Sequence, residues 1–155
     1  MVTKQINSDS IEDTLKLARH VGNNLKGGEI IELVGDLGSG KTTFVSGLVS
    51  GANSDDHVSS PTFMIKKEYK TPNLNIYHFD FYRLDESDLI VHELDDVASE
   101  PNSVVVIEWP KILKIPDLGK KIIFEFFYLS DIEKRIINIK HDQNFWVFSL
   151  KQMYL

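Results

Sequence analysis

The chain has 155 residues, of which 42% are hydrophobic and 26% are charged, and its formal net charge at pH 7 is −6. This composition is that of a globular domain able to bury a core, and it excludes collagen-like, coiled-coil and disordered chains. The absence of cysteine excludes disulfides, thiolate zinc sites and thiol nucleophiles, and the acidic charge argues against a sequence-independent grip on nucleic acid. We expect residues 1–155 to form one domain.

No segment predicts export or membrane insertion. Residues 1–13 contain no basic stretch leading into an apolar run. No apolar segment approaches the roughly 20 residues needed to span a bilayer. With no cysteine to suggest an oxidising compartment, we expect a cytoplasmic protein without a membrane partner.

The first half of the chain predicts a helix, a strand and a second helix. Over residues 10–25, apolar side chains recur at steps of three and four, which indicates a helix with one buried face. Ser10 and Asp13 suit the start of this helix. Residues 30–34 form a short apolar run that predicts a largely buried strand ending at Gly35. We expect the second helix to run from Lys41 to about Gly51.

The second half predicts two hairpins around a buried strand. Residues 63–70 and 74–81 are strand-like runs joined by the turn-forming triplet 71–73, and residues 122–128 and 135–141 form a similar pair. Between the pairs lie a short acidic helix at 85–97 and the β-branched run 104–107, which is typical of a central strand. Residues 143–155 form an aromatic tail to which we assign no role. The predicted fold is an α/β mixed sheet rather than a purely parallel one.

Residues 35–42, Gly-Asp-Leu-Gly-Ser-Gly-Lys-Thr, match the P-loop pattern G-x-x-x-x-G-K-[ST] in full. The motif follows a predicted strand and opens a predicted helix, so backbone N–H groups and the positive helix end converge on phosphate. Lys41 supplies a cation for the β- and γ-phosphate oxygens, and the Thr42 hydroxyl is placed to ligate Mg²⁺. The alternative is a glycine-rich turn with a chance lysine, which the strand and helix context disfavours.

The nucleotide is expected to be ATP rather than GTP. Guanine-specific P-loop proteins usually carry an Asn-Lys-x-Asp element and an Asp-x-x-Gly element, and the sequence has neither. We expect ATP and Mg²⁺ as the bound groups. The residues predicted to bind nucleotide are Gly35, Asp36, Leu37, Gly38, Ser39, Gly40, Lys41, Thr42 and Thr43.

A P-loop enzyme also needs acids near the metal and the attacking nucleophile. Glu108 ends the apolar run 104–107 and is the predicted metal-binding acid, together with Thr42; the alternative is a solvent-exposed acid at a strand end. Asp80 follows the second strand of the first hairpin and either serves the reaction or caps the next turn. Thr62, in a loop after the P-loop helix, is a candidate switch hydroxyl. The predicted catalytic residues are Lys41, Thr62, Asp80 and Glu108.

Three neighbouring residues have both structural and functional interpretations. His78 is more often a satisfied core histidine than a catalyst. Arg83 is interpreted as a surface residue paired with a nearby acid. Trp109 could stack on a nucleotide or a partner, but a buried tryptophan is the more usual role.

Taken together, GDLGSGKTTF, SSPTF, HFDFYRL and IEWP, in this order, resemble the TsaE family of bacterial ATPases for tRNA threonylcarbamoyladenosine synthesis. The resemblance runs from about residue 14 to residue 141. It implies the three-layer sandwich of P-loop NTPases, Mg²⁺ on Thr42 and Glu108, water or metal positioning by Asp80, and a switch role for Thr62. Ser39 and Glu93 depart from the usual alanine and glycine of the family.

The resemblance also implies a role in the cell. ATP hydrolysis would reset a complex of two partners, TsaB and TsaD, between rounds of threonylcarbamoylation of adenosine 37 in tRNA. The tRNA would then be contacted only indirectly, in agreement with the acidic charge. Because no arginine is obviously placed to reach the γ-phosphate, the isolated protein is expected to turn over slowly.

Two other functions remain open from the sequence. A small-molecule kinase shares the P-loop and the acids, but it usually adds an arginine-bearing lid, whereas the chain after Glu108 is mostly hairpin. A nucleotide-gated binding module would hold ATP without significant turnover.

Overall fold

The computed structural model describes residues 1–61, 64–83, 88–110 and 120–142. They form a seven-stranded mixed sheet with three helices, in the strand order β1-β7-β6-β2-β5-β4-β3. The strands are β1 (Val2–Ser8), β2 (Glu29–Val34), β3 (Lys66–Lys70), β4 (Asn75–Asp80), β5 (Ser103–Glu108), β6 (Lys120–Tyr128) and β7 (Arg135–His141). The helices are α1 (Ile11–Asn23), α2 (Lys41–Gly51) and α3 (Asp88–Ala98).

The centre of the sheet is parallel and its flanks are antiparallel. Strands β6, β2, β5 and β4 lie side by side in this order and run parallel to one another. The pairs β3–β4 and β6–β7 are antiparallel, which confirms both predicted hairpins. All six residues of β5 are buried, as expected for a strand covered on both faces.

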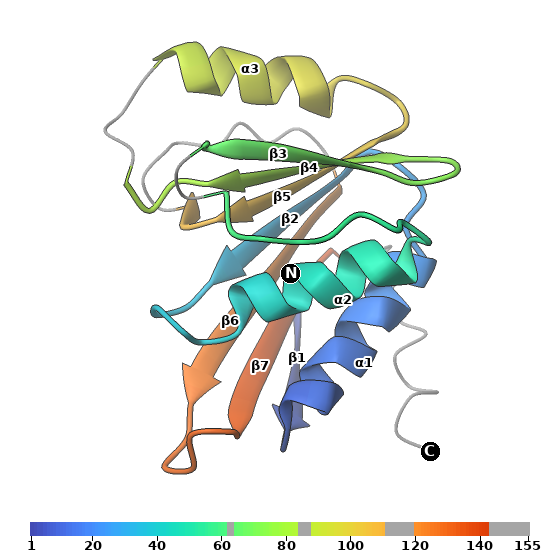
Figure 1. Ribbon diagram of the computed structural model, residues 1–155. Coiled ribbons are helices and arrows are strands. Elements are labelled where there is room, and N and C mark those ends of the chain that lie inside the picture. The colour runs from blue at the N-terminus through green and yellow to red at the C-terminus, as the bar shows by residue number, and fades with distance from the viewer. Residues whose placement is uncertain (62–63, 84–87, 111–119, 143–155) are drawn as a thin grey trace.

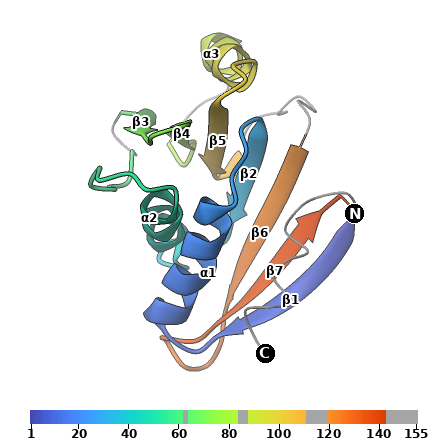
Figure 2. The same cartoon turned by 90° about the vertical axis from the view of Figure 1, so that its right-hand side faces the viewer.

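The helices cover the two faces of the sheet, which gives three layers. Helices α1 and α2 pack together over one face (Figure 2), where they build a core with side chains of β1, β7, β6, β2, β5 and β4. On the opposite face, Leu94 and Val97 of α3 pack against Tyr77, Phe79 and Ile107 of β4 and β5. This arrangement confirms the predicted α/β class with a mixed sheet.

Helix α2 is held close to α1 because glycines occupy the contact. A Cβ added at Gly47 would lie 2.7 Å from the Cβ of Ala18, and one added at Gly22 would lie 2.1 Å from the carbonyl oxygen of Leu48. Neither distance is possible for a real side chain. The glycines therefore fix the position of α2, and with it the loop that precedes the helix.

Strand β1 was not predicted. Its sequence, VTKQINS, is mostly polar, and only Ile6 and Ser8 are buried. It forms an edge strand by pairing antiparallel with β7 over its whole length. The remaining elements match the predicted ones to within a few residues, including the cap of α1, where the Asp13 N–H donates to Ser10 Oγ at 3.2 Å. None of the described helices is both long and apolar enough to cross a bilayer.

Candidate nucleotide site at the carboxyl edge of the parallel strands

The loop of residues 35–42, called the glycine-rich loop below, joins the carboxyl end of β2 to the start of α2. Gly40 caps α2 with φ 107°, and Gly38 has φ 72°; both values lie in the left-handed region that favours glycine. A Cβ at Gly38 would also lie 3.1 Å from the hydroxyl of Tyr128. The loop thus wraps tightly around the N-terminus of α2, the end of a helix that attracts anions.

The ammonium group of Lys41 is folded back into the glycine-rich loop. Nζ donates to the carbonyl oxygens of Gly35 and Asp36, both at 2.8 Å, and lies 4.4 Å from the centre of the Trp109 ring. Burial lowers the pKa of Lys41, while the carboxylates of Glu108, Asp80 and Asp36 oppose that shift. A cation is therefore held at the mouth of the loop, among carbonyl groups that a bound phosphate would replace as its partners.

Glu108 stands at the end of β5, facing the first turn of α2. Its Oε1 accepts a hydrogen bond from Thr42 Oγ1 at 3.2 Å and lies 2.9 Å from Nε2 of His78. Glu108 and His78 are 3% and 0% exposed. The imidazole Nδ1 in turn lies 3.5 Å from the Tyr69 hydroxyl, whose pKa is raised by burial. His78 is thus a core histidine that also fixes the predicted metal-binding acid.

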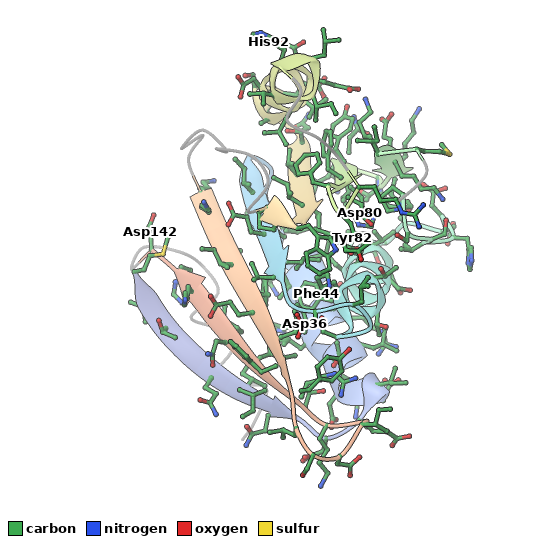
Figure 3. All side chains as sticks on the ribbon, turned by 90° about the vertical axis from the view of Figure 1, so that its left-hand side faces the viewer. Asp36, Phe44, Asp80, Tyr82, His92 and Asp142 are labelled. Atoms are coloured by element: carbon green, nitrogen blue, oxygen red, sulfur yellow. The ribbon has the colours of Figure 1, made fainter. Side chains whose placement is uncertain are left out.

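Asp80 lies beside Glu108, because the two residues are direct partners in the β4–β5 register. The Ser60 hydroxyl donates to Oδ2 at 3.1 Å, and the N–H of Tyr82 donates to Oδ1 at 2.9 Å. Asp80 therefore caps the turn after β4, as one interpretation had it, and also faces the site. Asp80 and Tyr82 lie together at this edge of the sheet (Figure 3).

These residues surround an open cleft of about 520 Å³. Eight of the residues predicted from the sequence line it, and so do four that were not. The predicted ones are Leu37, Gly38, Gly40, Lys41, Thr42, Thr43, Asp80 and Glu108, and the others are Ser60, Tyr82, Arg83 and Trp109.

The remaining predicted residues lie elsewhere. Gly35 and Asp36 line a separate cavity of about 250 Å³ together with Trp109, and Ser39, which is buried, lines a further cavity described below. Thr62 lies outside the described residues, so its switch role stays a prediction.

Two side interpretations are changed by the structure. Trp109 is half-buried rather than buried, has φ 61°, and forms a wall of the cleft with its ring 4.9 Å from that of Tyr82. Arg83 is exposed, as expected, but it lies at the cleft. An arginine therefore forms part of the cleft wall, which the sequence did not indicate.

The oxygen atoms of Thr42 and Glu108 suit Mg²⁺, which needs few protein ligands, better than a metal that is coordinated by protein side chains alone. Thr42 and Glu108 bring a hydroxyl and a carboxylate together at the N-terminus of α2. Within the described part of the chain, no group of three or more His, Asp or Glu side chains could hold a metal ion. Mg²⁺ is commonly held by one or two protein oxygens, with substrate phosphates and water completing its coordination.

A second cavity, of about 270 Å³, adjoins the glycine-rich loop on the α1 side. It shares Gly38, Gly40 and Thr43 with the cleft. Ile11 and Ile132 also line it, although they are 62% and 79% exposed. Sequence spacing gave no sign of this cavity, because its walls come from α1, the loop and the β6–β7 turn.

The comparisons with known proteins agree with one another. The family model described as threonylcarbamoyl adenosine biosynthesis protein TsaE matches residues 8–137. The protein of that name from Rickettsia typhi is 35% identical over 135 residues, covering 86% of this chain and 92% of the relative. Its counterpart from Aquifex aeolicus is 34% identical and covers 86% and 93%.

A crystal structure of YdiB from Bacillus subtilis superimposes with a TM-score of 0.78 at 25% identity, covering 98% of this chain and 94% of that one. This likeness extends over the whole sheet and confirms the predicted fold class. With the family match over most of the chain, it leads to one conclusion: the chain belongs to the TsaE family.

Proposed function

We propose that this chain binds ATP with Mg²⁺ and hydrolyses it to ADP and phosphate as the ATPase required for threonylcarbamoylation of adenosine 37 in tRNA. In this proposal, hydrolysis resets a complex of TsaB and TsaD between rounds of modification. The relatives from Rickettsia typhi and Aquifex aeolicus, which are named for threonylcarbamoyladenosine biosynthesis, support the pathway. The observation that carries the ATPase assignment is the meeting of Lys41, Thr42, Asp80 and Glu108 around one cleft.

Each of these side chains has a distinct task in hydrolysis. Lys41 exchanges its bonds to Gly35 and Asp36 for the β- and γ-phosphate oxygens. Thr42 and Glu108 would hold Mg²⁺, which would supply positive charge to the triphosphate. Asp80, at the same edge, orients the attacking water and accepts its proton through an oxygen that now bonds Ser60.

The second cavity is suited to the adenine base. Two exposed isoleucines, Ile11 and Ile132, flank a space that opens onto the same loop. Exposed apolar surface rimmed by polar residues is typical of ligand-binding grooves. A base placed between them would leave the triphosphate to follow the loop toward Lys41.

The acidic chain contacts tRNA only through its partners in this proposal. A net charge of −6 does not favour the phosphate backbone of a nucleic acid. TsaB and TsaD would present the tRNA, and this chain would contribute ATP hydrolysis.

The alternatives remain a small-molecule kinase and a binding module without significant turnover.

The decisive experiment measures phosphate release from Mg-ATP by the purified protein, alone and with TsaB and TsaD from the same source. We expect slow hydrolysis alone, faster hydrolysis with both partners, and none with the Lys41→Ala variant. Transfer of phosphate to a small acceptor, with no effect of the partners, would establish the kinase instead. Unimpaired tRNA modification by Glu108→Gln and Asp80→Asn variants would favour the binding module.

A further inference from the structure

Two side chains of the β6–β7 hairpin bind the outer side of the glycine-rich loop. The Tyr128 hydroxyl donates to the carbonyl oxygen of Leu37. Arg135 donates from Nε to the carbonyl oxygen of Ser39 at 3.1 Å and from Nη2 to that of Gly38 at 3.5 Å. Three successive carbonyl groups of the loop are therefore held by residues more than 90 positions away in the sequence.

The two side chains support each other. Tyr128 and Arg135 are direct partners in the β6–β7 register, at the end of the hairpin nearest the loop (Figure 1). The guanidinium lies 4.5 Å from the centre of the Tyr128 ring, and its Nη1 donates to the carbonyl oxygen of Lys134 at 2.8 Å. The guanidinium is thus fixed by its own hairpin, and we call the pair the hairpin clamp.

The clamp determines which way the peptide groups of the loop face. In a planar trans peptide, the C=O and the following N–H point in opposite directions. A Leu37 carbonyl directed at Tyr128 therefore turns the Gly38 N–H away from the hairpin, and a Ser39 carbonyl directed at Arg135 does the same for Gly40. Gly38 and Gly40 both line the cleft that contains Lys41.

We infer that Tyr128 and Arg135 are positioning residues that orient the Gly38 and Gly40 amides toward a bound triphosphate. This inference rests on the proposed function, because it assigns the two residues to the same phosphate site. The positive charge of Arg135 on the far side of the loop adds to the attraction for an anion. A loop already held in this conformation loses less conformational freedom when the phosphate binds.

A second explanation of Arg135 predicts a different result. Arg135 also lines the second cavity, where a guanidinium could contact the base of a nucleotide. A base contact affects only ligands that carry a base, whereas the hairpin clamp affects any ligand with a phosphate chain. Inorganic tripolyphosphate, which has no base, separates the two.

The test measures the Kd of Mg-ATP and of Mg-tripolyphosphate by calorimetry for the wild type and three variants. Tyr128→Phe removes one hydroxyl and keeps the ring, so we expect both ligands to bind about two- to tenfold more weakly. Arg135→Gln should weaken both by about ten- to a hundredfold, since its lost bonds are charged. Lys134→Gln is the matched control: it removes a positive charge next to Arg135, and Lys134 makes its hydrogen bonds with Asp131, Leu129 and Arg135 through its backbone.

A second measurement separates positioning from general loss of structure. In ¹⁵N-labelled, ligand-free protein, Tyr128→Phe should shift the amide signals of Gly38 and Gly40 while the midpoint of thermal unfolding stays close to that of Lys134→Gln. Tripolyphosphate binding by both clamp variants that equals the control overturns the inference, and so does a loss confined to ATP. A wild type that binds neither ligand overturns the proposed function itself.

Discussion

The two halves of the sheet contribute to the same loop in different ways. On one side, β4 and β5 run parallel to β2 and bring carboxylates to the carboxyl edge, where Asp80 and Glu108 are direct partners. On the other side, the β6–β7 hairpin supplies Tyr128 and Arg135, which bind loop carbonyls from outside the cleft. The half with β4 and β5 carries the carboxylates proposed to take part in the reaction. The half with β6 and β7 holds the backbone of the glycine-rich loop.

The largest effect is expected where both halves converge, at Lys41. The Lys41→Ala change removes the cation proposed to face the phosphates, so the rate of ATP hydrolysis should fall by about 100-fold or more. Phosphate release with and without the partners measures this. Lys26→Ala, an exposed lysine outside the cleft, should leave the rate unchanged; an equal loss there would show that net charge rather than the site is responsible.

The second prediction compares a glutamate on each half of the sheet, one on β5 and one on β6. Glu108→Gln should reduce hydrolysis by about 100-fold and weaken the dependence on Mg²⁺, because a carboxylate near the proposed metal is lost. Glu125→Gln is the counterpart on β6, opposite Val34 at the end of β2, where Glu125 pairs with Lys140 at 2.7 Å. It should retain nearly full activity. Similar losses in both variants, measured over a Mg²⁺ titration, would contradict the division between the halves.

A smaller effect is expected from the buried hydrogen bonds behind Glu108. The His78→Phe change removes the partner 2.9 Å from Glu108 Oε1, so the Mg²⁺ concentration for half-maximal hydrolysis should rise about tenfold. Tyr69→Phe removes only the outer hydroxyl, which lies 3.5 Å from His78, and should change that concentration less than threefold. Unchanged Mg²⁺ dependence in His78→Phe, with a folded circular dichroism spectrum, would assign His78 to the core alone.

The smallest effect lies away from the cleft, under α3. Burial, and then the hydrogen bond to Glu100, raise the pKa of Tyr77 to about 12. The unfolded chain therefore releases this phenolic proton first, at its ordinary pKa of about 10. The contribution of Tyr77 to the free energy of unfolding is therefore fully present below pH 10 and is lost as the pH rises toward 12.

Urea unfolding at pH 9 and pH 11 tests this sign. The free energy of unfolding should fall between these values by more in the wild type than in Tyr77→Phe, which has no proton to release. Equal slopes in the two proteins would show that the Tyr77 pKa is the same in the folded and unfolded chains. ATP hydrolysis at neutral pH should be the same in both.

Most of the fold could be predicted from local patterns. The buried runs of β2 and β5 and the amphipathic α1 each follow from the spacing of apolar residues along a short stretch. Strand β1 escaped this reasoning, because its polar sequence becomes a strand only through pairing with β7, more than 100 residues further along the chain. The close contact of α1 with α2 could not be predicted either, since a glycine in the sequence does not indicate which other part of the chain packs against it.

The sequence by itself determined the glycine-rich loop, its lysine and threonine, and the acids that end β4 and β5. These groups are identifiable because phosphate binding requires particular residue types at fixed spacing, and because strand ends place their side chains at one edge. Only the tertiary structure decided that His78 holds Glu108, that Trp109 and Arg83 form cleft walls, and that Tyr128 and Arg135 hold the loop from behind. Such contacts depend on strand order and register, which join residues that no local spacing connects.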